Sequence, residues 1–251
     1  MVQGLTKEGS GDVADNEFPS FATLMEFSLS TPVKVLCTGT AVTGVFVLST
    51  TSCMQKVPLA RNRVYLGRAK DLYTQEMSSY THNIAWWISY SEWARENNRV
   101  FEDGDPDIAI IRLSRRVDFS ERGGLALLPF EYNVPTHNLE VSLIGWTIST
   151  RFVGSQHLLA GIVETKSADI CILHLKQPHL RIKLEQDKLF CSLPEPHLSS
   201  VDEGGPVFYN KRVLVGINYW GSHSKSRDKK NLHINILYYK DFVKHFIFSP
   251  N

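Results

Sequence analysis

The sequence lacks any apolar run that approaches the roughly 20 residues needed to span a bilayer, so no membrane-spanning helix is predicted. It also lacks an excess of charge of either sign, since the formal net charge is +1. This balance does not indicate a nucleic acid or a membrane surface as a partner. The opening stretch, MVQGLTKEGSGDVADNEF, has no apolar core of a signal peptide. We therefore expect either a cytosolic protein or the mature form of a secreted one.

Cysteine is scarce, with Cys37, Cys53, Cys171 and Cys191 the only four in the chain. No CxxC, HxxH or HExxH pattern is present, so we expect no metal and no cofactor. The separations within the first pair and within the second pair suit two sequential disulfides, each worth about 3 kcal/mol through loop closure. Such bridges indicate an oxidising compartment. Four unpaired buried thiols remain the alternative.

Helical periodicity is also scarce, and short apolar runs separated by turn residues dominate the chain. This pattern predicts an all-β protein built as a barrel or sandwich. The expected strands are residues 20–27, 41–49, 62–66, 108–113, 140–145, 159–164, 189–191, 207–209, 213–218 and 233–237. One helical face is predicted at residues 239–248, and residues 77–98, which contain three tryptophans, are expected to form a surface excursion with packed aromatics.

Five segments carry a family resemblance. They read CTGTAVTGVFVLSTTSC at 37–53, DPDIAIIRL at 105–113, IGW at 144–146, SSVDEGGPVF at 199–208 continued by VGINYWG at 215–221, and LHINILYYKDFV at 232–243. In this order they resemble the CGGSLI…WVLTAAHC, NDIALIKL, VSGWG, GDSGGP…GIVSWG and GVYTRVxxYxxWI motifs of the chymotrypsin-like serine proteases, including arthropod members.

The resemblance implies one trypsin-like domain over residues 1–251. It would contain two packed six-stranded antiparallel β-barrels, at about 18–120 and 121–237, and a C-terminal helix at 238–248. The resemblance also implies the disulfides Cys37–Cys53 and Cys171–Cys191. Two further family bridges are missing, because other residues occupy their cysteine positions: Val141, Ser199, Tyr209 and Ser224.

The resemblance places a degenerate catalytic triad in the first, second and fourth of these segments. Ser52 stands at the histidine position, Asp107 matches the aspartate, and Glu203 stands at the serine position. A serine hydroxyl cannot act as a general base near neutral pH, and a carboxylate at position 203 opposes the negative charge of the oxyanion. Val201 replaces the oxyanion-hole glycine, and Asp202 matches the aspartate that binds the new N-terminus after zymogen cleavage.

Two of these residues invite structural roles. We expect the Glu203 carboxylate either to accept hydrogen bonds from the former oxyanion amides or to pair with a nearby Lys or Arg. We expect Asp107 to be a buried carboxylate, bonded to neighbouring amides or to Ser52.

The residues at the substrate-pocket positions are larger than in the family. His197 stands where trypsins carry an aspartate at the pocket base, and Asn231 replaces a small glycine in the wall. Tyr219 replaces the small residue before Trp220 and Gly221. We expect these changes to fill the specificity pocket.

The resemblance therefore implies a secreted pseudoprotease without catalytic residues. It would act by protein binding, as a cofactor, decoy or regulator in an extracellular proteolytic cascade of immunity, melanisation, complement or haemostasis. The alternatives are a hydrolase of unexpected type that uses Glu203 and Asp107, or a secreted structural protein without a specific partner. A basic stretch could contact a polyanion or simply be solvated; it contains Lys225, Arg227, Lys229 and Lys230.

Overall fold

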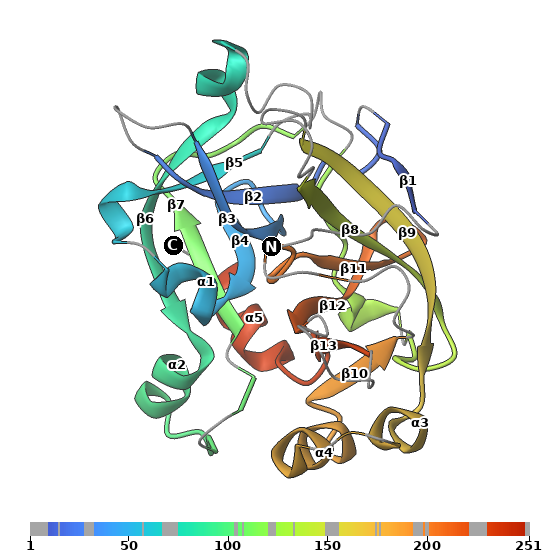
Figure 1. The fold of residues 1–251 in the computed structure, drawn as a ribbon. Helices are drawn as coiled ribbons and strands as arrows, with labels where there is room; N and C mark the ends of the chain where they lie inside the picture. Colours follow the sequence, from blue (N-terminus) through green and yellow to red (C-terminus); the bar gives the residue numbers. More distant parts are fainter. Residues whose placement is uncertain are drawn as a thin grey trace.

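The computed structural model describes most of the chain. The described residues are 10–14, 16–27, 33–56, 58–66, 75–102, 105–106, 108–119, 124–132, 134–148, 156–173, 175, 177–192, 198, 201–220 and 230–248. Figure 1 shows two β-barrels side by side, with the first half of the chain in one and most of the second half in the other.

The first barrel is closed, with strands in the order β2-β3-β4-β7-β6-β5. These are β2 (Phe21–Glu26), β3 (Lys34–Ala41), β4 (Phe46–Thr50), β5 (Asn62–Tyr65), β6 (Thr81–Ser89) and β7 (Ile108–Leu113). Apolar side chains such as Leu24, Val47 and Ile111 are fully buried and pack in one cluster. Alternation along each strand sends one set of side chains into the barrel and leaves the other set for the second barrel and the helices.

The second barrel contains six strands in the order β9-β10-β13-β12-β11-β8, and pairing of β8 with β9 closes it. These are β8 (Glu140–Ile148), β9 (Gln156–Lys166), β10 (Leu189–Ser192), β11 (Pro206–Tyr209), β12 (Val213–Trp220) and β13 (Asn231–Asn235). A short strand near the N-terminus, β1 (Ser10–Asp12), pairs with β9. The all-β, two-barrel prediction is confirmed.

The barrels meet through a shared aromatic core. Phe21 of the first barrel lies against Trp146 of the second, with ring centroids 6.4 Å apart, and the Trp146 indole N–H donates to Thr23 Oγ1 at 3.1 Å. Phe18 stacks on Phe208 at 5.9 Å. These contacts fix the two barrels relative to each other.

The helices are short and lie outside the barrels. They are α1 (Thr51–Gln55), α2 (Tyr90–Glu96), α3 (Ala168–Ile172), α4 (Pro178–Glu185) and α5 (Lys240–Ile247), with 3-10 turns η1 (Leu59–Arg61), η3 (Gln75–Tyr80) and η5 (Pro129–Glu131). The C-terminal helix was predicted and is confirmed. It returns to the first barrel, where Phe242 contacts Trp93 and Phe246 contacts Trp86, with centroids 5.4 Å and 5.7 Å apart. In the described part of the chain, no helix has the length and apolarity needed to cross a membrane.

Two sequence-based expectations are wrong. Residues 77–98 form no surface excursion: they contain β6, a strand of the first barrel, and α2. A β-bulge between Ile84 and Trp86 breaks the alternation of β6, which explains why its pattern was missed. The predicted strand at 41–49 spans the end of β3, a turn and most of β4. The aromatic packing expected here is confirmed, since Trp93 is buried in the core.

Both disulfides form as the resemblance implied. Cys37 pairs with Cys53 across β3 and α1, and Cys171 pairs with Cys191 across α3 and β10. No cysteine remains unpaired. The first bridge holds the N-terminus of α1, and therefore Ser52, beside the cleft.

Candidate functional site

Residues 201–205, here called the Glu203 turn, precede β11 and face the first barrel. The turn needs glycine at two positions. Gly204 has a φ of 82°, and a Cβ there would lie 2.3 Å from both Ser49 Oγ and the Thr38 carbonyl oxygen. A Cβ on Gly205 would lie 2.6 Å from Thr38 Oγ1. The Gly-Gly-Pro sequence thus shapes a tight turn pressed against the first barrel.

Hydrogen bonds hold the Glu203 turn on both sides. The Thr38 amide donates to the Glu203 carbonyl at 2.9 Å, and its hydroxyl donates to the Asp202 carbonyl at 3.0 Å. On the other side, the Asp202 carboxylate is fully buried and accepts the Trp146 amide at 2.8 Å. A Cβ on Gly145 would lie 2.3 Å from the same carboxylate oxygen. Asp202 therefore positions the turn through buried contacts that do not involve the Glu203 side chain.

The Glu203 carboxylate points to the N-terminal end of α1. Its Oε1 accepts the Ser52 hydroxyl and, at 3.2 Å, the Thr50 hydroxyl. Its Oε2 lies 3.5 Å from the Lys56 ammonium. Ser52 and Lys56 are four residues apart at the two ends of α1, so one side chain can meet both. Of the two roles expected for Glu203, pairing with a lysine is confirmed, and no backbone amide among the described residues donates to its carboxylate.

The Glu203 carboxylate is surrounded by two hydroxyl groups and one ammonium group. Among the described residues, no histidine hydrogen-bonds with Ser52 or Glu203. The Lys56 ammonium also donates a hydrogen bond to the Leu36 carbonyl oxygen at 3.1 Å, so it has an acceptor besides Glu203. What the site provides chemically is a carboxylate that accepts hydrogen bonds from two hydroxyls and forms an ion pair with one ammonium.

The described residues gather three potential metal donors here, from Cys37, Cys53 and Glu203, within 4.8 Å. The two sulfurs are joined in a disulfide and cannot bind a metal as thiolates. The cluster therefore leaves a single carboxylate, which makes no metal site.

Asp107 lies outside the described residues, so its expected hydrogen bonds stay a prediction. Its flanks are well anchored: Pro106 and Ile108 are buried. Just before them, the buried Asp105 carboxylate binds the ammonium groups of Lys183, on α4, and of Lys188, which is 2.8 Å away.

The Asp105 cluster bridges the two barrels. Glu102 completes it, at 3.0 Å from Lys183 and 3.1 Å from Lys188. Burial alone lowers the pKa of Lys188, but hydrogen bonds to Asp105 and Glu102 raise it overall, so this lysine stays charged. The segment before β7 is thereby tied to α4 and the start of β10.

The former pocket positions are partly described. Asn231 is fully buried, and its side-chain oxygen accepts the Leu198 amide at 3.4 Å. Val201 is buried, and Tyr219 packs partly buried against the shared core. His197, Gly221 and the Trp220 side chain lie outside the described residues. A filled specificity pocket therefore stays a prediction, to which Asn231 and Val201 contribute buried volume.

Of the basic stretch, Lys225, Arg227 and Lys229 lie outside the described residues. The Lys230 ammonium donates to carbonyl oxygens of Ile170, of Cys171 at 3.0 Å and of Leu173 at 2.6 Å. These carbonyls end α3, where a cation is favourable. Lys230 thus has an internal structural role at the C-terminus of α3.

Sequence reasoning missed one buried polar centre beside the former pocket. His233 is fully buried on β13, two residues from Asn231. Its Nε2 lies 3.0 Å from Ser192 Oγ and its Nδ1 3.1 Å from Asn218 Oδ1. Burial lowers the pKa of His233 to about 3, so the ring is neutral at pH 7. The only sequence signal was the alternating Asn231, His233 and Asn235, an unusual polar set for an inward strand face.

Comparison with known proteins agrees with this geometry. The trypsin family model matches residues 9–243. A structure of HL collagenase has a TM-score of 0.72 at 18% identity and covers 100% of both chains. A scabies mite inactivated protease paralogue has a TM-score of 0.74 at 16% identity and covers 96% of this chain and 100% of its own. With two closed barrels, both disulfides and a family match over nearly its whole length, the chain belongs to the trypsin family of chymotrypsin-like serine proteases and their homologues.

Proposed function

We propose that this chain is a non-catalytic serine protease homologue that acts by binding a protein. The observation that carries the proposal is the hydrogen bond that the Glu203 carboxylate accepts from the Ser52 hydroxyl. We assign Glu203 to the nucleophile position and Ser52 to the histidine position. A second observation is the ion pair between that carboxylate and the Lys56 ammonium at 3.5 Å.

The chemistry of acyl transfer supports this reading. The reaction needs a hydroxyl nucleophile, an imidazole that takes its proton and amide donors aimed at a developing oxyanion. A carboxylate about 4 Å from that oxyanion would repel it by about 4 kcal/mol at an effective dielectric constant near 20. Loss of both the nucleophile and the base removes a factor of about 10⁶ in turnover in a comparable triad.

The proposed setting is extracellular, and the proposed partner is a component of a proteolytic cascade. Two disulfides, Cys37–Cys53 and Cys171–Cys191, favour an oxidising compartment. One similar structure is that of an inactivated protease paralogue, which supports a role that does not require catalysis. The family's loops around the cleft remain the expected contact surface, because they recognise polypeptides in active members.

Two measurements test this function. Pure protein incubated with peptide, ester and glycoside substrates should give no turnover above buffer. Turnover that disappears in Glu203→Ala would contradict the proposal and favour the hydrolase that uses Glu203 and Asp107.

The second measurement concerns the partner. Immobilised protein is exposed to haemolymph or plasma, with a reduced and denatured sample as the matched control. Reproducible enrichment of a protease zymogen, a protease or a protease inhibitor is expected. Absence of any enriched protein over the control would favour a structural protein without a specific partner.

A further inference from the structure

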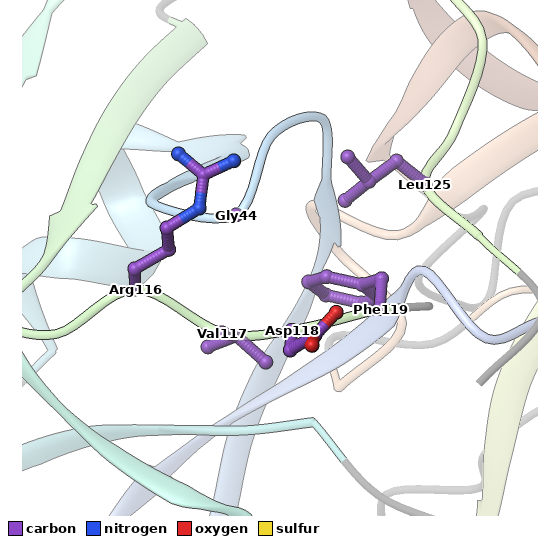
Figure 2. Close-up of a pocket in the computed structure, with 6 residues that line it drawn as sticks. All are labelled: Gly44, Arg116, Val117, Asp118, Phe119 and Leu125. Carbon is purple, nitrogen blue, oxygen red and sulfur yellow. The ribbon is translucent and has the colours of Figure 1, made fainter. Parts of the chain in front are cut away.

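A pocket of about 470 Å³ lies where the chain leaves the first barrel. Its lining comes from the turn between β3 and β4 and from the segments that follow β7: Gly44, Arg116, Val117, Asp118, Phe119 and Leu125. Figure 2 shows Arg116 beside Gly44 on one side and Leu125 on the other, with Phe119 below Leu125 and next to Asp118. None of these residues belongs to the former catalytic cleft.

The strand register places this pocket far from Glu203. Gly44 precedes β4 and Ser52 follows it, and β7 runs antiparallel with Ile108 beside Thr50 and Arg112 beside Phe46. A five-residue strand at about 3.3 Å per residue separates the two ends by roughly 15 Å. The pocket and the cleft are therefore at opposite ends of β4, and occupancy of one does not block the other.

Backbone hydrogen bonds build the pocket before any ligand arrives. The Val117 amide donates to the Gly44 carbonyl at 2.7 Å, and the Leu113 amide donates to the Val45 carbonyl at 2.8 Å. The segment that contains Leu125 is held in place by the Ala126 amide, which donates to the Ala41 carbonyl oxygen at 3.2 Å. Three separate segments are thus fixed to one another, as in pre-formed ligand sites.

The floor is apolar and the rim carries a cation. Val117 and Phe119 are buried, and Leu125 packs partly buried on the same cluster. Arg116 is exposed, and among the described residues its guanidinium has no hydrogen-bond or ion-pair partner, whereas Asp118 has a partner within the protein. Among the lining residues that the structure describes, the pocket thus offers one positive charge without a partner, above an apolar surface.

The opening of the pocket depends on a glycine. A Cβ on Gly44 would lie 2.8 Å from the Val117 carbonyl oxygen and 3.2 Å from Arg116 Cγ. Any larger side chain would press on the arginine stem and occupy the space beside it. Glycine therefore leaves the guanidinium accessible from the pocket.

We propose that this pocket binds a carboxylate that carries an apolar group. The planar guanidinium of Arg116 matches a carboxylate with two parallel hydrogen bonds, and the floor of Val117, Phe119 and Leu125 covers an aliphatic or aromatic body. A volume of about 470 Å³ suits one or two amino-acid residues or a small organic acid. This inference goes beyond the proposed function and does not depend on whether the cleft is catalytic.

The test is an NMR titration of the ¹⁵N-labelled full chain, read at the amides of Val117, Phe119 and Leu125. Two carboxylates are compared with neutral analogues of the same shape. N-acetyl-leucyl-glutamic acid amide is paired with N-acetyl-leucyl-glutamine amide, and 4-methylpentanoate is paired with 4-methylpentanamide. We expect at least one carboxylate to shift these amides with an affinity about tenfold above that of its neutral analogue. Tighter binding of the dipeptide would indicate a peptide as the ligand, and tighter binding of 4-methylpentanoate would indicate a free organic acid.

Matched variants assign the effect. Arg116→Gln should reduce carboxylate affinity to that of the neutral analogue, and Arg115→Gln, an exposed neighbour outside the lining, should leave it unchanged. Gly44→Val should weaken both the carboxylates and the neutral analogues. Failure of both carboxylates to shift the three amides, or equal affinity in Arg116→Gln, would overturn the proposal. Both results are independent of the substrate assays at Glu203, so they test this proposal separately from the proposed function.

Discussion

Ser52 donates its hydroxyl to the Glu203 carboxylate, so the two residues that we propose stand at the triad's histidine and serine positions bind each other. Under the proposed function, Ser52 is a hydrogen-bond donor at the base position and Glu203 is an acceptor at the nucleophile position. Thr50 adds a second hydroxyl at 3.2 Å, and Lys56 adds a charge at 3.5 Å. Two hydroxyls and one ammonium thus provide partners for the Glu203 carboxylate.

The first prediction concerns restored triad residues. The double variant Ser52→His with Glu203→Ser should recover little peptide hydrolysis, because Val201 and Asn231 remain buried at the oxyanion and pocket positions. His197 is expected to obstruct the pocket base as well. Hydrolysis of peptide esters is the measurement. Robust turnover by the double variant would show that the pocket substitutions matter less than we infer.

The second prediction contrasts two adjacent carboxylates. Glu203→Gln should change the free energy of unfolding by no more than about 1 kcal/mol, since the Glu203 and Lys56 side chains are 19% and 31% exposed. Asp202→Asn should cost about 2 kcal/mol, because Asp202 is fully buried and accepts the Trp146 amide. Denaturant titration measures both. Equal losses would contradict the separate roles of the two residues.

The third prediction concerns the bridge between the barrels. Asp105→Asn should destabilise the fold by about 3 kcal/mol, because it leaves Lys183 and Lys188 buried without their shared charge. Glu102→Gln is the control and should cost less, since the Glu102 side chain is 49% exposed. Thermal unfolding of the three proteins gives the comparison. A larger loss of stability in the Glu102 variant would contradict this prediction, because it would make Glu102 and not Asp105 the main partner of the two lysines.

The fourth prediction is a pH dependence. The pKa of His233 is lowered from 6.5 to about 3 by burial, so the unfolded chain binds the proton more readily than the folded one. The stability due to a neutral His233 is complete above pH 6.5 and is lost as the pH falls from there toward 3.

A matched variant separates this component from the carboxylates that also titrate. His233→Phe should lose less stability than the wild-type chain between pH 7 and about pH 4.5, measured by urea unfolding at each pH. Parallel pH curves for the two proteins would contradict the assignment.

Much of the fold could be predicted from the sequence, because the motifs around Gly145, Gly204 and Gly205 mark backbone positions with no room for a larger side chain. At Gly204, for example, a Cβ would clash with two atoms of the first barrel. Such local requirements appear directly in sequence. Strand β6 could not be predicted in this way, because its β-bulge interrupts the alternation of side chains by which a strand is recognised in a sequence.

The site was predictable at its centre and less so around it. Spacing to Cys53 identified Ser52, and the Gly-Gly-Pro turn identified Glu203, but the pairing with Lys56 required knowledge that α1 begins at Thr51. His233 gave no motif, since its partners Ser192 and Asn218 come from two other strands. The pocket at Gly44 joins three segments through backbone hydrogen bonds, which no single stretch of sequence encodes.

The most direct test is intact-mass spectrometry of the folded protein after treatment with a fluorophosphonate that modifies activated serines. We expect no mass increase in the wild-type chain, because the nucleophile position is Glu203 and the Ser52 hydroxyl is bound to its carboxylate. An active trypsin-family protease in the same experiment should be labelled completely. Stoichiometric labelling of this chain, mapped to Ser52 or to any other serine of the cleft, would contradict a non-catalytic site.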